Sequence, residues 1–121
     1  MKAINTESAP AAVGPYSQAI VAGEFLFASG QIPLDPKTGE IVTGGISPQA
    51  IRVLENLKSV IEAAGAQMSQ VVKVTIYITD MAQFSTVNEI YARYFAKPFP
   101  ARACVEVSGL PKGVEVEMDA V

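Results

Sequence analysis

Residues 71–79, VVKVTIYIT, form the most regular segment in this chain of 121 residues. Aliphatic side chains occupy every second position, at Val72, Val74, Ile76 and Ile78, and polar or aromatic residues stand between them. This period of two predicts a β-strand with one apolar face and one mixed face. Such a strand needs neighbouring strands and a layer that covers its apolar face, so the rest of the chain must supply both.

Helical patterns flank this strand on both sides. Before it, Ser47-Pro48 predicts a helix start, with serine as N-cap and proline at the first helical position, and Gly65 predicts the end. The residues between them that share one apolar stripe are Val53, Leu54, Leu57, Val60, Ile61 and Ala64. After the strand, residues 83–95 predict a second helix, which Pro98 prevents from continuing.

Shorter strand patterns complete the chain. SQAIVAGEFLFASG, residues 17–30, predicts two strands joined around Ala22-Gly23, and residues 101–107 and 114–120 predict two more. The first fifteen residues are small and proline-rich, which favours an extended arm. The predicted order is β-β-α-β-α-β-β, in one domain over residues 1–121. Two helices can cover only one face of such a sheet, so we expect a two-layer α+β fold.

The second face of the sheet is then uncovered. Ala103 and Val105 alternate with Arg102 and Cys104, and the last strand alternates Val116 and Met118 with Glu117. If the aliphatic residues face the helices, Arg102, Cys104 and Glu117 share the uncovered face. A half-apolar open sheet is typical of an oligomer surface, so we expect a homo-oligomer with Arg102 near a subunit boundary.

Composition excludes several kinds of chemistry. The chain has no histidine and a single cysteine, so neither a Ser-His-Asp triad nor a zinc site of Cys and His ligands can form. Its net charge is −3 and it has no basic run, which makes nucleic-acid binding unlikely. No apolar run is long enough to cross a bilayer, and the N-terminus lacks a signal-peptide pattern, which together favour a cytoplasmic protein.

Each candidate residue also has an ordinary structural interpretation. Arg102 is either an interface arginine paired with a carboxylate or a fork-shaped recognition group for an anionic substrate. Cys104 is more often a small buried residue than a nucleophile. Glu117 is either a solvated strand residue or a group that orients water and carries protons. Tyr16 and Ser29-Gly30 are compatible with an ordinary turn and strand end.

Longer sequence motifs that include these residues are more specific than any of the residues alone. APAAVGPYSQAI, FASGQIPLDPKTGEIV, VNEIYARYF and FPARACVEV followed by LPKGVEVEMDA resemble the RidA family, also called YjgF/YabJ-like proteins. The resemblance implies a fold similar to the trimeric bacterial chorismate mutases, with three sheets around a central barrel, helices outside, and sites in clefts between subunits. It also implies hydrolysis of reactive 2-imino acids and their enamine tautomers to 2-oxo acids and ammonia, without cofactor or metal.

The resemblance assigns roles to individual residues. Arg102 would hold the substrate carboxylate, and Glu117 would position the attacking water. The residues expected to line the pocket with them are Tyr16, Ser29, Gly30, Asn88 and Cys104. Two other functions ascribed to relatives stay open here: a trimer that senses small carboxylates without turnover, and a ribonuclease or translation inhibitor.

Overall fold

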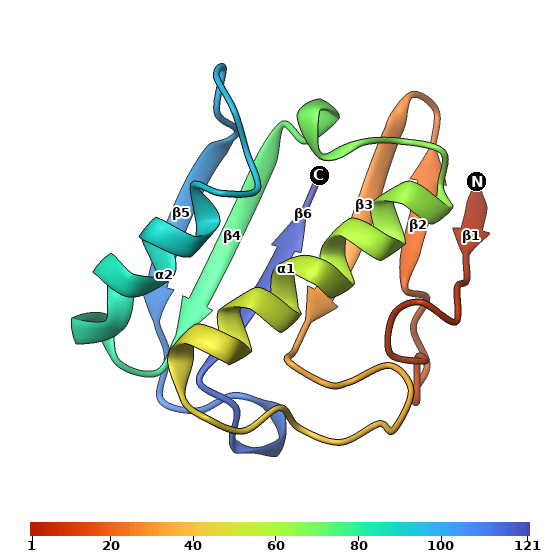
Figure 1. The fold of residues 1–121 in the computed structure, drawn as a ribbon. Helices are drawn as coiled ribbons and strands as arrows, with labels where there is room; N and C mark the ends of the chain where they lie inside the picture. The colour runs from red at the N-terminus through yellow and green to blue at the C-terminus, as the bar shows by residue number, and fades with distance from the viewer.

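The computed structural model describes residues 1–121 and contains one six-stranded sheet with two helices on the same face (Figure 1). The strands are β1 (Lys2–Ile4), β2 (Ala19–Ala22), β3 (Phe25–Gln31), β4 (Lys73–Ile78), β5 (Ala101–Glu106) and β6 (Val116–Ala120). The helices are α1 (Ile46–Ala63) and α2 (Phe84–Tyr91). The predicted two-layer α+β class is therefore confirmed, and the face opposite the helices, here called the open face, is uncovered.

The strand order in the sheet is β1-β2-β3-β6-β4-β5. Only β4 and β5 are parallel, and α2 lies in the crossover between them. The last strand of the chain, β6, is inserted between β3 and β4 and is antiparallel to both. This insertion pairs Ala120 with Ala28 and Met118 with Gln31, so the C-terminal residues lie beside residues from the first quarter or so of the chain.

The core lies between α1 and the central strands. Val74, Ile76 and Ile78 of β4 are fully buried, as are Val116 and Met118 of β6. The α1 residues that meet them are Val53, Leu54, Leu57, Val60 and Ile61. The strand predicted over residues 71–79 is thus confirmed at its centre, although Val72 lies outside β4 and is 54% exposed.

The helix boundaries differ from the prediction. Helix α1 begins at Ile46, its N-cap is Gly45, and no side chain caps it, so Ser47 is not the cap. Gly44 and Gly45 both have positive φ, 107° and 95°. This two-glycine turn redirects the chain, so the helix can begin before the serine. Gly65 has a φ of 83° just beyond the helix, as expected of a residue that ends it.

The second helix is shorter than predicted, and the N-terminal arm is partly regular. Residues 81–83 form a single 3₁₀ turn, and α2 ends at Tyr91 rather than at residue 95.

The first residues form β1, which pairs antiparallel with β2 at the edge of the sheet. A three-residue strand has too little sequence pattern to be recognised without its partner. No helix is long and apolar enough to cross a membrane.

The burial pattern of β4 predicts a matched pair of stability effects. Ile76→Ala should lower the free energy of unfolding by about 2–5 kcal/mol, because it leaves a cavity in the core. Ile51→Ala removes the same atoms from the outer side of α1, where the residue is 38% exposed, and should change stability by less than about 1 kcal/mol. Urea denaturation of both variants measures the difference, and equal losses would contradict the described core.

Candidate functional site

The register of β5 places two of the candidate residues on an unexpected face. Arg102 pairs with Val74 and Cys104 pairs with Ile76, and residues paired in register point to the same side of a sheet. Both partners on β4 are buried beneath the helices. Arg102 and Cys104 therefore point toward the helix layer, and the prediction that they share the uncovered face is wrong.

The reason lies in the position of β5 at the edge of the sheet. Helix α1 does not reach this strand, and only the short helix α2 lies beside it (Figure 1). Ala103 and Val105 take the open face instead, where Val105 is 42% exposed. Polar and charged side chains on the helix side of an edge strand remain close to solvent, so the usual rule of aliphatic residues inward does not hold here.

Arg102 is held by two aromatic rings and one amide. Its guanidinium carbon lies 5.3 Å from the ring centre of Phe84 and 4.9 Å from that of Tyr91, both on α2. Its Nη1 donates a hydrogen bond of 2.6 Å to Oδ1 of Asn88. The single ion pair of the chain is Arg93–Glu89, so Arg102 has no carboxylate partner. The guanidinium is therefore oriented while most of its donors stay free.

A cavity of about 390 Å³ lies beside this arginine. Its lining consists of Asn88, Tyr91, Ala92, Phe99, Pro100 and Arg102. The hydroxyl of Tyr91 is buried and has no hydrogen-bond partner within the chain, and burial raises its pKa despite the opposing charge of Arg102. Cys104 lines neither this cavity nor the larger one described below. Its side chain packs against the core, and burial raises the pKa of its thiol.

Glu117 lies on the open face, as predicted. It pairs with Tyr77 of β4 and stands beside β3, where the register with β6 shifts between Ala28 and Gln31. Such an irregularity inserts an extra residue and bends the strand locally. The Glu117 carboxylate occupies the place that a Cβ on Gly30 would take, so a glycine is required for this approach.

The surroundings of Glu117 alter its protonation. Burial raises the pKa of its carboxyl group above the ordinary value, and the nearby charge of Asp119 raises it further. Asp119 itself accepts a hydrogen bond of 2.9 Å from the hydroxyl of Tyr77. Glu117 is thus a partly desolvated carboxyl group that can accept or release a proton closer to neutral pH than an exposed glutamate.

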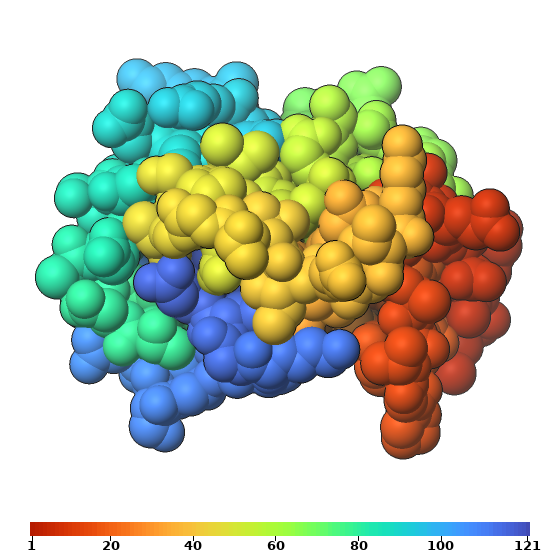
Figure 2. Space-filling model, turned by 60° about the horizontal axis from the view of Figure 1, so that its bottom comes forward, coloured from red at the N-terminus to blue at the C-terminus, as the bar shows by residue number.

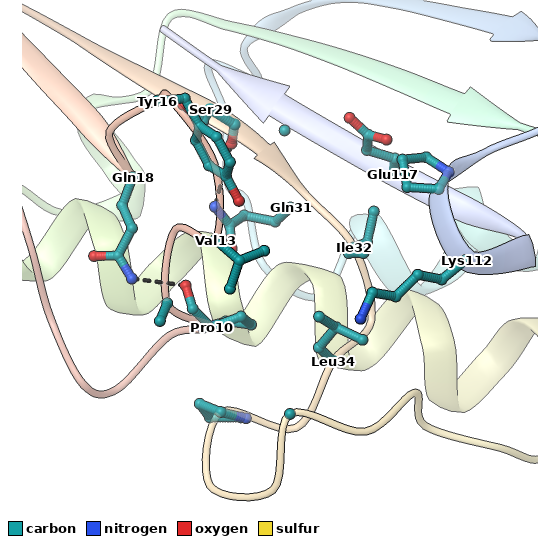
Figure 3. Close-up of a pocket in the computed structure, with 15 residues that line it drawn as sticks. Pro10, Val13, Tyr16, Gln18, Ser29, Gln31, Ile32, Leu34, Lys112 and Glu117 are labelled. Carbon is teal, nitrogen blue, oxygen red and sulfur yellow. Dashed lines mark hydrogen bonds between the residues drawn. The ribbon is translucent and has the colours of Figure 1, made fainter.

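Glu117 borders the largest cavity of the molecule, about 650 Å³ in volume. The cavity also contains Tyr16, Ser29 and Gly30, so four of the predicted site residues lie together (Figure 3). Figure 2 shows this side of the molecule, where a notch separates the red-orange N-terminal segment from the blue segment that leads into β6. The remaining lining residues are Pro10, Ala11, Val13, Gln18, Gln31, Ile32, Leu34, Pro36, Gly39, Pro111 and Lys112.

Hydrogen bonds from one buried amide hold the N-terminal wall of this cavity. Gln18 is 2% exposed, and its Nε2 donates to the carbonyls of Thr6, Ala9 and Pro10, while its Oε1 accepts from the Thr6 N–H. The hydroxyl of Ser29 donates to the carbonyl of Ser17 at 2.6 Å. These bonds position the segment that carries Tyr16, so the predicted arm is ordered against the sheet.

Six of the seven predicted site residues therefore lie in two separate groups, here called half-sites, and Cys104 belongs to neither. The cationic half-site, Arg102 with Asn88, lies on the helix side, and the acidic half-site, Glu117 with Tyr16, Ser29 and Gly30, lies on the open side. No group of three or more histidine, cysteine or acidic side chains is arranged to hold a metal ion.

Sequence reasoning missed several contributors to these half-sites. The contact of Phe84 and Tyr91 with the guanidinium was not predicted, although their rings support it. Gln18 and Lys112 received no role, because nothing in a single sequence shows that an amide is buried or that an exposed lysine borders a cavity. Both belong to the motifs GPYSQ and LPKG, which were the only available signal.

These features define a class of protein. It is a two-layer α+β protein in which one face of the sheet is uncovered, a carboxylate packs against a glycine, and an arginine on the edge strand has no acidic partner. The model of the family described as Endoribonuclease L-PSP matches residues 6–121. The chain belongs to this family, which includes the Rid and YjgF proteins, and the resemblance inferred from the motifs is confirmed.

Individual relatives cover nearly the whole chain. It is 58% identical to the RutC family protein PH0854 of Pyrococcus horikoshii, over 98% of this chain and 94% of that protein. It is 47% identical to the 2-iminobutanoate/2-iminopropanoate deaminase of Salmonella typhimurium, over 99% and 95%. The crystal structure of E. coli TdcF with bound serine superposes with a TM-score of 0.94 at 42% identity, covering 99% of this chain and 96% of that one.

The contact between Gly30 and Glu117 predicts a local effect that does not depend on activity. Gly30→Ala should displace the carboxylate toward solvent, so the pKa of Glu117 should fall toward its ordinary value. The cost in stability should lie near the lower end of the about 1–3 kcal/mol typical of overpacking, because only the end of a flexible side chain has to move. Carbon NMR of the labelled carboxyl group measures the pKa.

Gly109→Ala is the matched control, because a Cβ at that position meets nothing within 4 Å. Its Glu117 titration should coincide with that of the unmodified protein. A Gly30→Ala protein that titrates in the same way as this control would contradict the described approach.

Proposed function

We propose that this protein is an imine deaminase that hydrolyses small 2-imino acids, such as 2-iminopropanoate and 2-iminobutanoate, without a cofactor. In the overall reaction the C=N bond is replaced by C=O: the imino acid and one water give the 2-oxo acid and ammonia. Relatives at 45% and 47% identity carry the name 2-iminobutanoate/2-iminopropanoate deaminase, which supports this assignment. A more similar relative, PH0854, carries only a family name, so the substrate range belongs to the proposal.

The observation that carries the proposal is the unpaired guanidinium of Arg102. It is oriented by Phe84, Tyr91 and Asn88 and has no acidic partner. A planar guanidinium in this state matches a carboxylate through two parallel hydrogen bonds. The relative TdcF was crystallised with serine, whose carboxylate is of the same chemical kind.

The two half-sites lie on opposite faces of one chain, so the complete site in this proposal is formed between copies. Arg102 of one copy and Glu117 of another would face the same ligand across the boundary, in a homotrimer whose open faces surround the centre. Apolar residues on the open face support such packing. Phe25, Phe27 and Val105 are 55%, 48% and 42% exposed there, and large exposed apolar side chains are typical of a surface that another chain covers.

In the proposed mechanism Arg102 binds the substrate carboxylate and thereby fixes the neighbouring imine carbon. Water adds to this carbon of the protonated imine and forms a C–O bond, the second electron pair of the C=N bond moves to nitrogen, and Glu117 accepts a proton from the water. The product of this step is a tetrahedral carbinolamine. Glu117 then returns its proton to the nitrogen and the C–N bond breaks. Ammonia leaves, while the hydroxyl group loses its proton to solvent and becomes the C=O group of the 2-oxo acid. The raised pKa of Glu117 suits a group that both takes up and returns a proton.

The chemistry of the substrate indicates its origin. Free 2-imino acids and their enamine tautomers arise when pyridoxal-phosphate enzymes eliminate a group from an amino acid, and they react with other proteins before water destroys them. An enzyme that only orients a substrate that is already electrophilic needs modest catalytic power. We therefore propose a protective role, in which hydrolysis removes these by-products.

The ribonuclease activity in the family description finds less support in this chain. The net charge is −3 and no histidine is present. An RNA-binding protein generally relies on a cluster of basic residues that neutralises phosphates. Here the two half-sites offer one guanidinium and one carboxylate, a combination that suits a small monoanion.

Arg102→Ala should abolish most of the rate acceleration. Two charged hydrogen bonds are lost, and each contributes about 1.5–3 kcal/mol, so kcat/KM should fall at least about 100-fold. The assay follows 2-oxo acid formation from 2-aminoacrylate generated in the cuvette. Arg93→Ala replaces a second arginine next to α2 and serves as control. Its kcat/KM should stay within about twofold of normal, because it loses only an exposed ion pair.

Unchanged acceleration in Arg102→Ala would refute the assignment. Binding of 2-oxobutanoate without any turnover by the unmodified protein would favour a sensor.

Mixing two inactive variants tests the shared site. Arg102→Ala and Glu117→Gln should each lower turnover while the assembly persists. Co-expression of both should restore activity to about one quarter of normal, because a site between copies can draw each intact residue from a different chain. Native mass spectrometry confirms that the mixed assemblies form, because it resolves the small mass difference between the two variants. Activity no higher than that of the separate variants would mean that the two residues do not meet across a boundary.

A further inference from the structure

The larger cavity exceeds the needs of the smallest substrates. A cavity of about 650 Å³ lies in the range that accommodates drug-sized ligands, whereas imino acids of three or four carbons are far smaller. The cavity begins at Gly30 and Glu117, where the proposed reaction takes place. Its remaining walls continue along the N-terminal segment and the loop after β3, past Val13, Ile32 and Leu34. These walls leave room for a substrate side chain.

One charged group besides Glu117 lines this cavity, and it is Lys112. In Figure 3 its side chain runs past Ile32 to Leu34, so the ammonium group lies away from the Glu117 carboxylate. Lys112 forms no ion pair, since the single salt bridge of the chain joins Arg93 to Glu89. An unpaired ammonium next to apolar walls is a ready partner for an anionic group that enters along them.

The backbone at Lys112 supports a specific role. Its φ is 58°, and it is the single non-glycine residue of the chain with positive φ. A lysine in this conformation costs free energy relative to the glycine or asparagine that turns of this kind favour. Gly113, which follows it, has a φ of 69° and meets the demands of the same turn. The local geometry alone therefore does not explain a lysine at this position, whereas a function of its side chain does.

We infer that Lys112 extends the substrate range to 2-imino acids with a second carboxylate at the end of the side chain, such as 2-iminoglutarate. This inference rests on the proposed deaminase function. With the α-carboxylate on Arg102 and the imine carbon at Glu117, the side chain of such a substrate passes Ile32 and Leu34 and places its distal carboxylate at the Lys112 ammonium. Arg102 and Lys112 thus contact different ends of one dianion.

The test compares two substrates of equal carbon number. Amino-acid oxidases release 2-iminoglutarate from glutamate and 2-iminopentanoate from norvaline in the cuvette, and the rate of imine loss is measured with and without the protein. Lys112→Asn should lower kcat/KM for 2-iminoglutarate about tenfold. One charged hydrogen bond is lost, and its contribution is reduced because the lysine is exposed to solvent. It should leave the value for 2-iminopentanoate unchanged, because asparagine tolerates positive φ and this substrate has no second anionic group for the ammonium to contact.

Two further variants separate charge from structure. Lys112→Arg keeps the charge and should retain the preference for the dianion, while Lys37→Asn removes a lysine outside the cavity and should change neither substrate. An equal loss on both substrates in Lys112→Asn, or no loss on either, would overturn the inference. A protein that hydrolyses neither substrate would refute the proposed function itself, so the two failures are distinguishable.

Discussion

The insertion of β6 between β3 and β4 is the constraint on which the acidic half-site depends. Two antiparallel ladders hold this strand, so its register with both neighbours is set by backbone hydrogen bonds. That register buries Val116 and Met118 beneath α1 and leaves Glu117 on the open face. A shift by one residue would bury the carboxylate and expose the aliphatic side chains, at a large cost in free energy. The position of Glu117 is therefore maintained by the core itself.

In β5, too, the register with the neighbouring strand decides which face each side chain takes, but here it places the charged residue on the helix side. Its parallel ladder with β4 aligns Arg102 with a buried valine, and the guanidinium consequently lies on the helix side. At the centre of the sheet this would be costly, but at the edge the side chain stacks on Phe84 and Tyr91 and still reaches solvent. The aliphatic face of β5 is left on the open side. One strand thus provides both a positioned cation on the helix side and an exposed apolar surface on the open side.

The separation of the two charges has a functional consequence. If Arg102 and Glu117 faced each other within one chain, they would form an internal ion pair and neither would be free for a ligand. With the sheet between them, the guanidinium keeps its unpaired donors and burial keeps the carboxyl pKa raised. Each half-site is formed independently, and the proposed association of copies completes the site only where a boundary exists.

The sequence by itself determined the fold class, the two-layer arrangement and most strands, because period-two and helical patterns record which side chains are buried. Its motifs indicated the family by resemblance. It also placed Glu117 on the correct face, since β6 is a central strand and obeys the rule of aliphatic residues inward. Only the tertiary structure decided the face of Arg102, the edge strand β1, the supporting rings of Phe84 and Tyr91, and the side chain of Lys112 along the cavity. These depend on which strand lies at the edge and on where the β3–β6 register shifts. Both are properties of pairings between distant segments, which alternation within a single segment does not encode.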